Sequence, residues 1–440
     1  MAGLMSVEEA RAAVLAAIDG PLGSEQVATD EALARVPAAP VTAVVSLPPW
    51  DNSAMDGYAI RAADTAGATE TDPARLRVIG DIPAGKAPAV DVGPGTAVRI
   101  ATGAPVPRGA DAVVPVEQTT PIDARGAAGP RGRDATGPLP AECLVHDAVA
   151  HGMSIRPAGS DLEAGAVLVG SGARLTPAMI ALVAGAGVPE VLVHRLPRVA
   201  VLATGDEVRA PGSPLGPAGI PDANGPGLRA LLRAAGCQPI DLGIAGDDLD
   251  DVLERLRRGL AAGADAVIVS GGVSVGPYDV VKTAIERLGR IDLWRVAVQP
   301  GKPFAFGTAE RPGGGPSVLV FGLPGNPVSS FVTFELFVRP ALRRLAGRRD
   351  LLRPGDRAVL LEPVAKSHGR RAFLRVISER DDAGAAIRDE SGRVRVRLAG
   401  GQGSHVISAL AAADALAVIP EAHDTLPAGA TVALWWLDTD

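Results

Sequence analysis

Cysteine and long apolar runs are both scarce in this chain of 440 residues. The two cysteines, Cys143 and Cys237, are far apart, which excludes a disulfide framework and a cysteine-based zinc site. The six histidines are scattered without metal-binding spacing. The best apolar run, residues 178–188, is too short to span a membrane, and the first residues carry acids where a secretion signal carries bases. We therefore expect a cytoplasmic protein in a reducing compartment, with no membrane partner.

Lysine is rare as well, and no excess of positive charge is present. Four of the 43 basic residues are lysines, and the formal net charge is −7. This balance argues against binding to nucleic acid or to an anionic membrane surface. It still allows a local basic site for one anionic small molecule, and Lys282 and Lys302 lie close to glycine-rich turns that suit such a site.

Hydrophobic periodicity divides the chain into four kinds of region. Ser6 and Glu9 predict a capping box at the start of a helix. Residues 41–145 predict a module of short strands, in which residues 119–142 form a loose loop. Strands and helices alternate from residue 198 to residue 346, which is typical of a doubly wound α/β domain, and short strands return after residue 349. The α/β strands are expected at residues 198–203, 239–244, 264–270, 292–298 and 317–321, and its helices at residues 225–235, 249–262, 280–288 and 329–345.

Three glycine-rich turns within sixty residues are the main functional signal. The first, at residues 270–276, follows an apolar strand and contains Gly271, Gly272 and Ser274, a pattern typical of a backbone nest for anions. The second, at residues 300–303, contains Lys302 and Pro303. The third, Gly322-Leu-Pro-Gly-Asn-Pro-Val-Ser329, leads from a strand into a helix. Strand, turn and helix start in this order direct N–H groups at an anion, so we expect one site for several phosphate-like groups.

Carboxylates follow two strands of the same predicted sheet. Asp206 and Glu207 come after the first strand, where either can bind a metal or a ribose or can cap a turn. Asp247 and Asp248 follow the second strand. Because Asp248 also fits the N-cap of the next helix, Asp247 is the functional candidate of that pair.

Two further groups of residues leave alternatives open. Asp279 and Lys282 lie one turn apart beyond the first glycine turn, where they suit metal binding and charge neutralisation or form a surface pair of small effect. The turn around Trp50, Asp56 and Tyr58 combines acids with rare aromatic residues. Those aromatic rings are either part of the core or a stacking surface for a ring-shaped ligand.

Taken together and in this order, these motifs resemble the molybdopterin molybdenumtransferase family, known as MoeA in bacteria and as the E domain of gephyrin in animals. The resemblance runs nearly from end to end. It implies a multidomain α/β plus β protein: an elongated domain from residues 1–44 and 146–195, a β module from residues 45–145, an α/β domain of the molybdenum cofactor biosynthesis type from residues 196–346, and a barrel-like β domain from residues 347–440. The motifs that carry it are residues 51–59, 101–107, 156–162, 203–207, 270–276, 300–303, 322–329 and 401–405.

The resemblance also implies a reaction, in which adenylated molybdopterin and molybdate give molybdenum cofactor and AMP. A divalent metal, usually Mg²⁺, and a homodimer are implied as well, and other proteins of the same biosynthesis are possible partners. Glu207, Asp247 and Asp279 would line the metal and nucleotide region, with Lys282 near the phosphates. Lys302, Ser329, Arg375 and Ser404 would hold molybdate. Asp56, Thr102 and Asp161 would act across the dimer.

The chain departs from the family at two positions where many members have lysine. These positions hold Arg295, which keeps the charge, and Gln299, which loses it. Two other functions remain as alternatives at this point. A molybdopterin adenylyltransferase would share the α/β domain but usually lacks the flanking modules, and a non-catalytic scaffold of the gephyrin type would need a partner-binding surface or a long linker.

Overall fold

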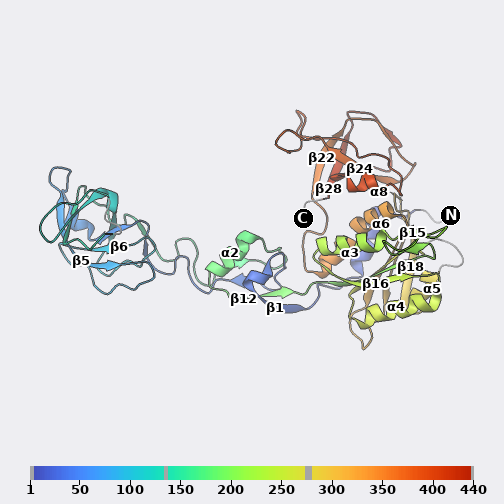
Figure 1. Cartoon of the computed structure of the whole chain (residues 1–440), viewed down its shortest axis with the longest axis horizontal. Helices are drawn as coiled ribbons and strands as arrows, with labels where there is room; N and C mark the ends of the chain where they lie inside the picture. The colour runs from blue at the N-terminus through green and yellow to red at the C-terminus, as the bar shows by residue number, and fades with distance from the viewer. Residues whose placement is uncertain (1–3, 133–136, 273–279, 438–440) are drawn as a thin grey trace.

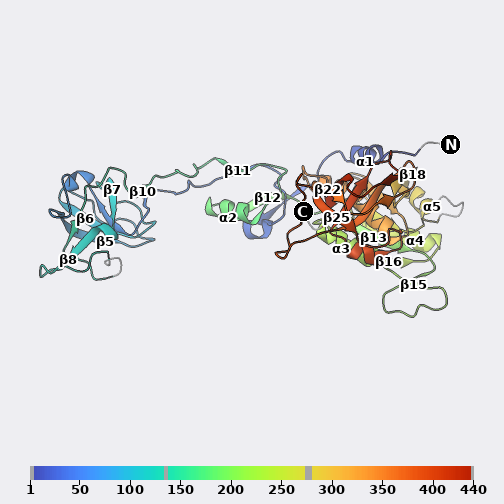
Figure 2. The same cartoon turned by 90° about the horizontal axis from the view of Figure 1, so that it is seen from above.

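The computed structural model describes residues 4–132, 137–272 and 280–437. The chain is elongated, with a β module at one end, a thin middle domain, and two packed domains at the other end (Figures 1 and 2). In the described part of the chain, no helix is both long and apolar enough to cross a membrane. The predicted combination of α/β and β domains is confirmed.

The α/β domain is built on a six-stranded sheet with the order β16-β13-β17-β21-β20-β18. Strands β16, β13, β17 and β21 are parallel to one another, and β20 is antiparallel to both of its neighbours, β21 and β18. The bounds are β13 (Arg198–Thr204), β16 (Gln238–Ala245), β17 (Ala266–Ser270), β18 (Gly289–Arg295), β20 (Pro303–Ala309) and β21 (Val318–Leu323).

Both faces of this sheet are covered, as a doubly wound domain requires. Val199 and Val201 of β13 belong to one apolar cluster, whereas the intervening Ala200 and Leu202 belong to another. The first cluster includes residues of α3 and α6, and the second includes residues of α4 and α5. Asp248 caps α4 by accepting the N–H of Asp251 at 2.8 Å, as predicted. The bounds are α3 (Asn224–Ala234), α4 (Leu249–Ala261), α5 (Val280–Glu286) and α6 (Pro327–Thr333).

One predicted strand of this domain is wrong. The structure divides residues 292–298 between β18 and a separate strand, β19 (Val298–Gln299), which pairs with the C-terminal domain. Strand β20 was not expected, because its first residue, Pro303, belongs to a turn motif. The helix expected over residues 329–345 consists of α6, a π-helix (Phe334–Val338) and α7 (Arg339–Leu345).

The first helix, α1 (Val7–Ala16), has the predicted capping box, because Ser6 and Glu9 each accept the backbone N–H of the other. The predicted boundary at residue 44 placed this helix in the middle domain, but the helix does not pack there. Val7 and Val14 are instead buried in the α/β core with Phe334 and Phe337. An amphipathic pattern requires an apolar partner but does not say which one, so the sequence left this packing open.

The middle domain joins two distant segments of the chain. Strand β1 (Ser24–Ala28) pairs with β12 (Glu190–His194), and β2 (Val41–Thr42) pairs with β11 (Val167–Val169). Helix α2 (Pro177–Gly185) is capped by Thr176, as expected.

The β module at the far end has the strand order β7-β4-β6-β5-β9-β8. The loop expected at residues 119–142 begins with a strand, β8, because Thr119 and Ile122 are buried against β9. Tyr58 is buried in the module core, whereas half of Trp50 is exposed. The bounds are β4 (Gly57–Ile60), β5 (Ala74–Ile82), β6 (Thr96–Ile100), β7 (Ala112–Pro115), β8 (Thr119–Ile122) and β9 (Glu142–Val145).

The C-terminal domain forms a closed ring of strands, because β24 pairs with both β25 and β26. Strand β19 of the preceding domain extends the ring through β24. The bounds are β22 (Gly355–Leu360), β24 (Arg371–Ser378), β25 (Val394–Leu398), β26 (Ala415–Ile419) and β28 (Thr431–Trp436), and a short helix, α8 (Ile407–Ala411), precedes β26.

Both cysteines are buried, and neither forms a disulfide. Burial raises the pKa of Cys237 to about 12, because the thiolate loses hydration inside the core. The thiol is therefore protonated at neutral pH, in keeping with a structural role.

A buried carboxylate anchors the segment that leads to the C-terminal domain. Glu335, in the π-helix, is fully buried and accepts hydrogen bonds from Arg339 and from Arg353, both at 2.8 Å. Arg353 lies on the connection to the barrel, so this carboxylate holds that connection against the α/β core.

We predict that Glu335→Gln destabilises the α/β domain, because two buried guanidinium groups lose a charged acceptor. Breaking a buried ion pair costs about 3–5 kcal/mol, which lowers the calorimetric transition midpoint by roughly 10 °C. The control is Asp292→Asn, which removes an exposed pair with Arg290 and should change stability by less than about 1 kcal/mol. Equal midpoints for the two variants would contradict this role.

Candidate active site

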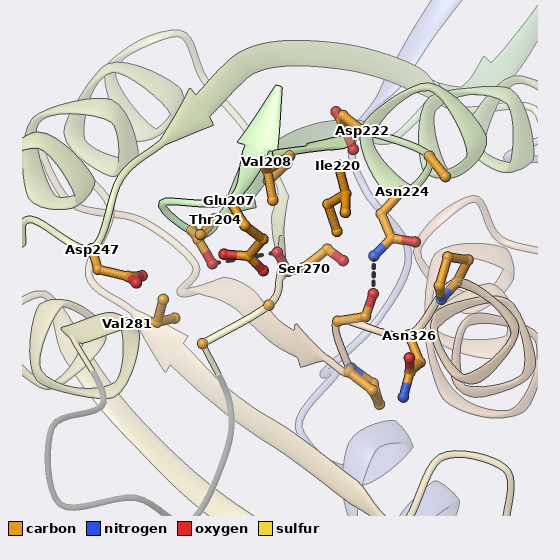
Figure 3. A pocket seen from close by; sticks show the side chains of 18 of the residues that line it. Thr204, Glu207, Val208, Ile220, Asp222, Asn224, Asp247, Ser270, Val281 and Asn326 are labelled. Atoms are coloured by element: carbon orange, nitrogen blue, oxygen red, sulfur yellow. Dashed lines mark hydrogen bonds between the residues drawn. The ribbon is translucent and has the colours of Figure 1, made fainter. Parts of the chain in front are cut away.

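A cavity of about 920 Å³ opens at the carboxyl ends of β13 and β17 (Figure 3). Within the sheet, β16 lies on one side of β13 and β17 lies on the other, so the order of the strands reverses at β13. Ligands of doubly wound sheets bind where the strand order reverses in this way. The lining comes from the ends of these strands, from the starts of α3 and α6, and from one loop of the C-terminal domain.

The glycine turn after β17 contacts the end of β13. Gly271 has φ +98°, and a Cβ there would lie 2.6 Å from the carbonyl oxygen of Thr204. Gly272 has φ +63°, and a Cβ there would lie 2.5 Å from Cγ2 of Val281. Both glycines line the cavity, as does the predicted residue Pro303. Ser274 and Asp279, which were also predicted here, lie outside the described residues.

Of the four predicted carboxylates, two line the cavity and two have structural roles. Glu207 and Asp247 are exposed and line the cavity, and Figure 3 shows them on separate loops at the strand ends. Asp206 instead accepts the backbone N–H of Asp247 at 3.0 Å, so it positions the loop that carries Asp247. Asp248 caps a helix.

Glu207 and Asp247 fit a magnesium ion that is shared with a phosphorylated substrate. Among the described residues, no group of three or more His, Cys, Asp or Glu side chains is placed to hold a metal. Magnesium usually takes one or two protein carboxylates and completes its shell with water and substrate phosphate oxygens. Two exposed carboxylates beside an anion-binding turn meet that requirement.

Backbone contacts bring the four predicted oxyanion residues into one neighbourhood. A Cβ on Gly301, next to Lys302, would lie 3.6 Å from the carbonyl oxygen of Ser329. Val328 donates its N–H to the carbonyl of Ser404 at 3.2 Å. The Arg375 guanidinium contacts the carbonyls of Gly401 and Gly403 in the same loop, both at 3.1 Å.

Arg375 has an unusual environment for a cation. Its side chain is almost completely buried, and its Nε–H has no hydrogen-bond partner among the described residues. Burial lowers the pKa of the Arg375 guanidinium, because the charged form loses hydration. A buried guanidinium with an N–H group left over is suited to an oxyanion ligand.

Three further positions, Lys282, Gln299 and Arg295, lie away from the cavity lining. Lys282 forms an i,i+4 ion pair with Glu286 at 3.5 Å on α5 and does not line the cavity, although Val281 beside it does. Gln299 accepts the backbone N–H of Ser367 at 2.8 Å, so its amide joins the C-terminal domain to the α/β domain. Arg295 is exposed at the end of β18.

Asp56 and Thr102 form a second cluster in the β module. The Asp56 carboxylate accepts the Thr102 N–H at 2.7 Å and its hydroxyl at 3.0 Å. Asp161 lies on the connection to the middle domain, where its N–H donates to the carbonyl of Leu47. Within one chain this module is at the opposite end from the α/β domain (Figures 1 and 2), so these residues do not join Glu207 in the same chain.

Sequence reasoning missed two polar residues at the start of α3 that line the cavity. Asn224 donates from Nδ2 to the carbonyl of Gly325 at 2.7 Å and joins the starts of α3 and α6. Asp222 is buried and accepts the N–H of Gly225 at 2.9 Å. The signal was a pair of polar residues just before a glycine-initiated helix, which indicated a helix start and no more.

These features define the class: a multidomain protein whose α/β crevice is lined by a glycine turn and carboxylates and lies beside a loop of the C-terminal domain. The model for the MoeA N-terminal region (domain I and II) matches residues 5–187, the model for a probable molybdopterin binding domain matches residues 200–344, and the model for the MoeA C-terminal region (domain IV) matches residues 357–437. The chain belongs to the MoeA family of molybdopterin molybdenumtransferases.

Individual relatives agree over the full length. The chain is 40% identical to molybdopterin molybdenumtransferase 2 of Mycobacterium tuberculosis, over 90% of each protein. It is 34% identical to the molybdopterin molybdenumtransferase of Haemophilus influenzae, over 98% of each. A solved molybdopterin biosynthesis MoeA protein from Pyrococcus horikoshii superposes with a TM-score of 0.78 at 32% identity, and 99% of each chain is covered.

We predict that Arg375→Lys loosens the loop of residues 401–405, because the shorter lysine side chain ends before the position of the guanidinium nitrogen that donates to both carbonyls. Amide hydrogen exchange in this loop should become at least about tenfold faster, since hydrogen bonds to charged groups contribute roughly 1.5–3 kcal/mol each. The control is Arg380→Lys, at an exposed pair with Asp414. Unchanged exchange in the first variant would show that the Gln402 side chain, which bonds both backbone groups of Arg375, is sufficient to hold the loop.

Proposed function

We propose that this protein inserts molybdate into adenylated molybdopterin and releases AMP, which forms the molybdenum cofactor. The observation that supports the proposal is the placement of two regions, each of which would bind an anion, beside each other. One is the cavity at the strand ends, and the other surrounds Arg375. Their contact through Val328 and Ser404 suits a reaction in which a phosphoanhydride and an oxyanion must meet.

The cavity would hold the nucleotide and its phosphates. Glu207 and Asp247, joined by Asp279, would hold a divalent metal, for which Mg²⁺ is the first candidate. When bound, this ion would neutralise charge on the bridging phosphates. The turn at Gly271 and Gly272 brings backbone close to the same space, and fixed donors of this kind stabilise a leaving phosphate without reorganisation.

The second region would hold molybdate. The planar fork of Arg375 matches an oxyanion in shape and charge. Lys302 would supply a second cation, and Ser329 and Ser404 would supply hydroxyl donors. Because tungstate has the same charge and shape, these groups would bind it as well.

The active form would be a homodimer in which the β module of one subunit approaches the cavity of the other. The separation of Asp56, Thr102 and Asp161 from the cavity supports this assembly. Helix α2 consists of apolar residues, yet only Val183 of its nine residues is buried. Val44, Val167 and Leu192 are further exposed apolar residues of the middle domain, which supports the use of this domain as the subunit interface.

The location of the protein and its partner proteins are also part of this proposal. The two buried cysteines, neither in a disulfide, support a reducing, cytoplasmic location. Other proteins of molybdenum cofactor biosynthesis would supply the substrate. The full-length agreement with relatives named as molybdenumtransferases favours this activity over adenylyl transfer, for which the flanking modules have no evident use.

We predict that Glu207→Gln and Asp247→Asn each lower kcat/KM for AMP release roughly a hundredfold, because each removes a charged oxygen from the metal and phosphate region. Purified protein would receive adenylated molybdopterin, Mg²⁺ and graded molybdate, and AMP would be measured. Asp382→Asn, on an exposed turn of the C-terminal domain, is the matched control. No molybdate-dependent AMP from the folded parent protein would refute the proposed activity.

We predict that Ala181→Glu on the exposed face of α2 dissociates the dimer, because the interface would bury an unpaired carboxylate. The dissociation constant measured by sedimentation should rise at least about a hundredfold. Ala230→Glu, on the exposed face of α3, is the matched control. A monomeric parent protein, or equal dissociation constants for the two variants, would argue against this interface.

A further inference from the structure

The charged side chains in the described lining of the cavity are almost all negative. Among the described residues of the lining, the acidic ones are Glu207, Asp222 and Asp247, and no lysine or arginine is present. An adenylated phosphoanhydride is itself anionic, so most charged groups of the lining would repel it.

His405 is the exception among the described lining residues, because an imidazole can donate a hydrogen bond and carry a positive charge. It is exposed, and it is contributed by the C-terminal domain, whereas the rest of the described lining comes from the α/β domain. His405 therefore reaches the carboxylate-lined cavity from a separate domain.

The loop that carries His405 is held from several sides. Arg375 binds the carbonyls of Gly401 and Gly403, and Val328 donates to the carbonyl of Ser404. The Gln402 side chain bonds both backbone groups of Arg375. A surface histidine without a role needs no such support, whereas a ligand contact gains from a fixed backbone.

Gly403 leaves room for the ring of His405. A Cβ at Gly403 would lie 2.8 Å from Cε1 and 3.1 Å from Nδ1 of that ring. Because the φ of Gly403 is not positive, an alanine is compatible with the backbone and would meet the ring first, with Cγ2 of Val406 next at 3.3 Å. This glycine therefore allows the orientation of His405 to be tested without changing its chemistry.

We propose that His405 is a substrate-binding residue that donates a hydrogen bond to the phosphoanhydride of the adenylated substrate. The assignment rests on the proposed function and adds a contact from the C-terminal domain. It gives that domain a direct part in binding the nucleotide end of the substrate, beside its part in the oxyanion pocket.

The test uses ADP-ribose, whose phosphoanhydride is flanked by esters on both sides, as the probe in calorimetric titrations of the full-length protein. His405→Ala should weaken its binding roughly ten- to a hundredfold, the range of a charge-assisted hydrogen bond. His405→Lys should recover part of the loss. His423→Ala, at an exposed histidine of the same domain, should bind as the parent does.

Gly403→Ala provides the second variant. It should weaken ADP-ribose binding with His405 still present, and in the complete reaction both variants should raise KM for the adenylated substrate more than they lower kcat. Parent-like affinity of His405→Ala would overturn the assignment and leave the proposed function standing. Failure of the parent protein to bind ADP-ribose would overturn both.

Discussion

The pairing of β19 with β24 is the contact on which the arrangement of the site depends. Val298 and Gln299 add a short strand to the C-terminal barrel, and the Gln299 amide makes a further bond to the backbone of Ser367. This junction holds the barrel on the α/β domain, and the loop of residues 401–405 comes to lie over the crevice as a result. Without it, the Arg375 region and the cavity would belong to separate bodies.

Arg371 strengthens the same junction by joining three parts of the chain. Its N–H donates to the carbonyl of Ala297, and its guanidinium forms ion pairs with Glu8 of α1 and Glu421 of the barrel. The ion pairs of Arg371 therefore join the N-terminal helix to the barrel, and its backbone hydrogen bond joins the barrel to the α/β domain. Gln299, where the sequence resemblance led us to expect a lysine, takes part in this interface through its side-chain amide.

Local signals in the sequence were enough to predict most of the α/β domain. Branched apolar runs predicted β13 and β17, and Asp248 predicted the start of α4, because these features depend on neighbours in sequence. Strand β20 was missed because its first residue belongs to a proline-flanked turn. The different roles of Asp206 and Glu207 could not be predicted, since they depend on a contact with Asp247 from another loop. His405 was missed for a similar reason, because the docking of a separate domain brings it to the cavity.

The position of α1 has a consequence for synthesis of the protein on the ribosome. Val7 and Val14 emerge first, yet they pack against Phe334 and Phe337, which emerge several hundred residues later. The β module between them is continuous in sequence and can fold as soon as it appears, because its strands pair locally. The α/β domain cannot close its core in that order. The apolar face of α1 stays exposed until the π-helix and α7 have left the ribosome.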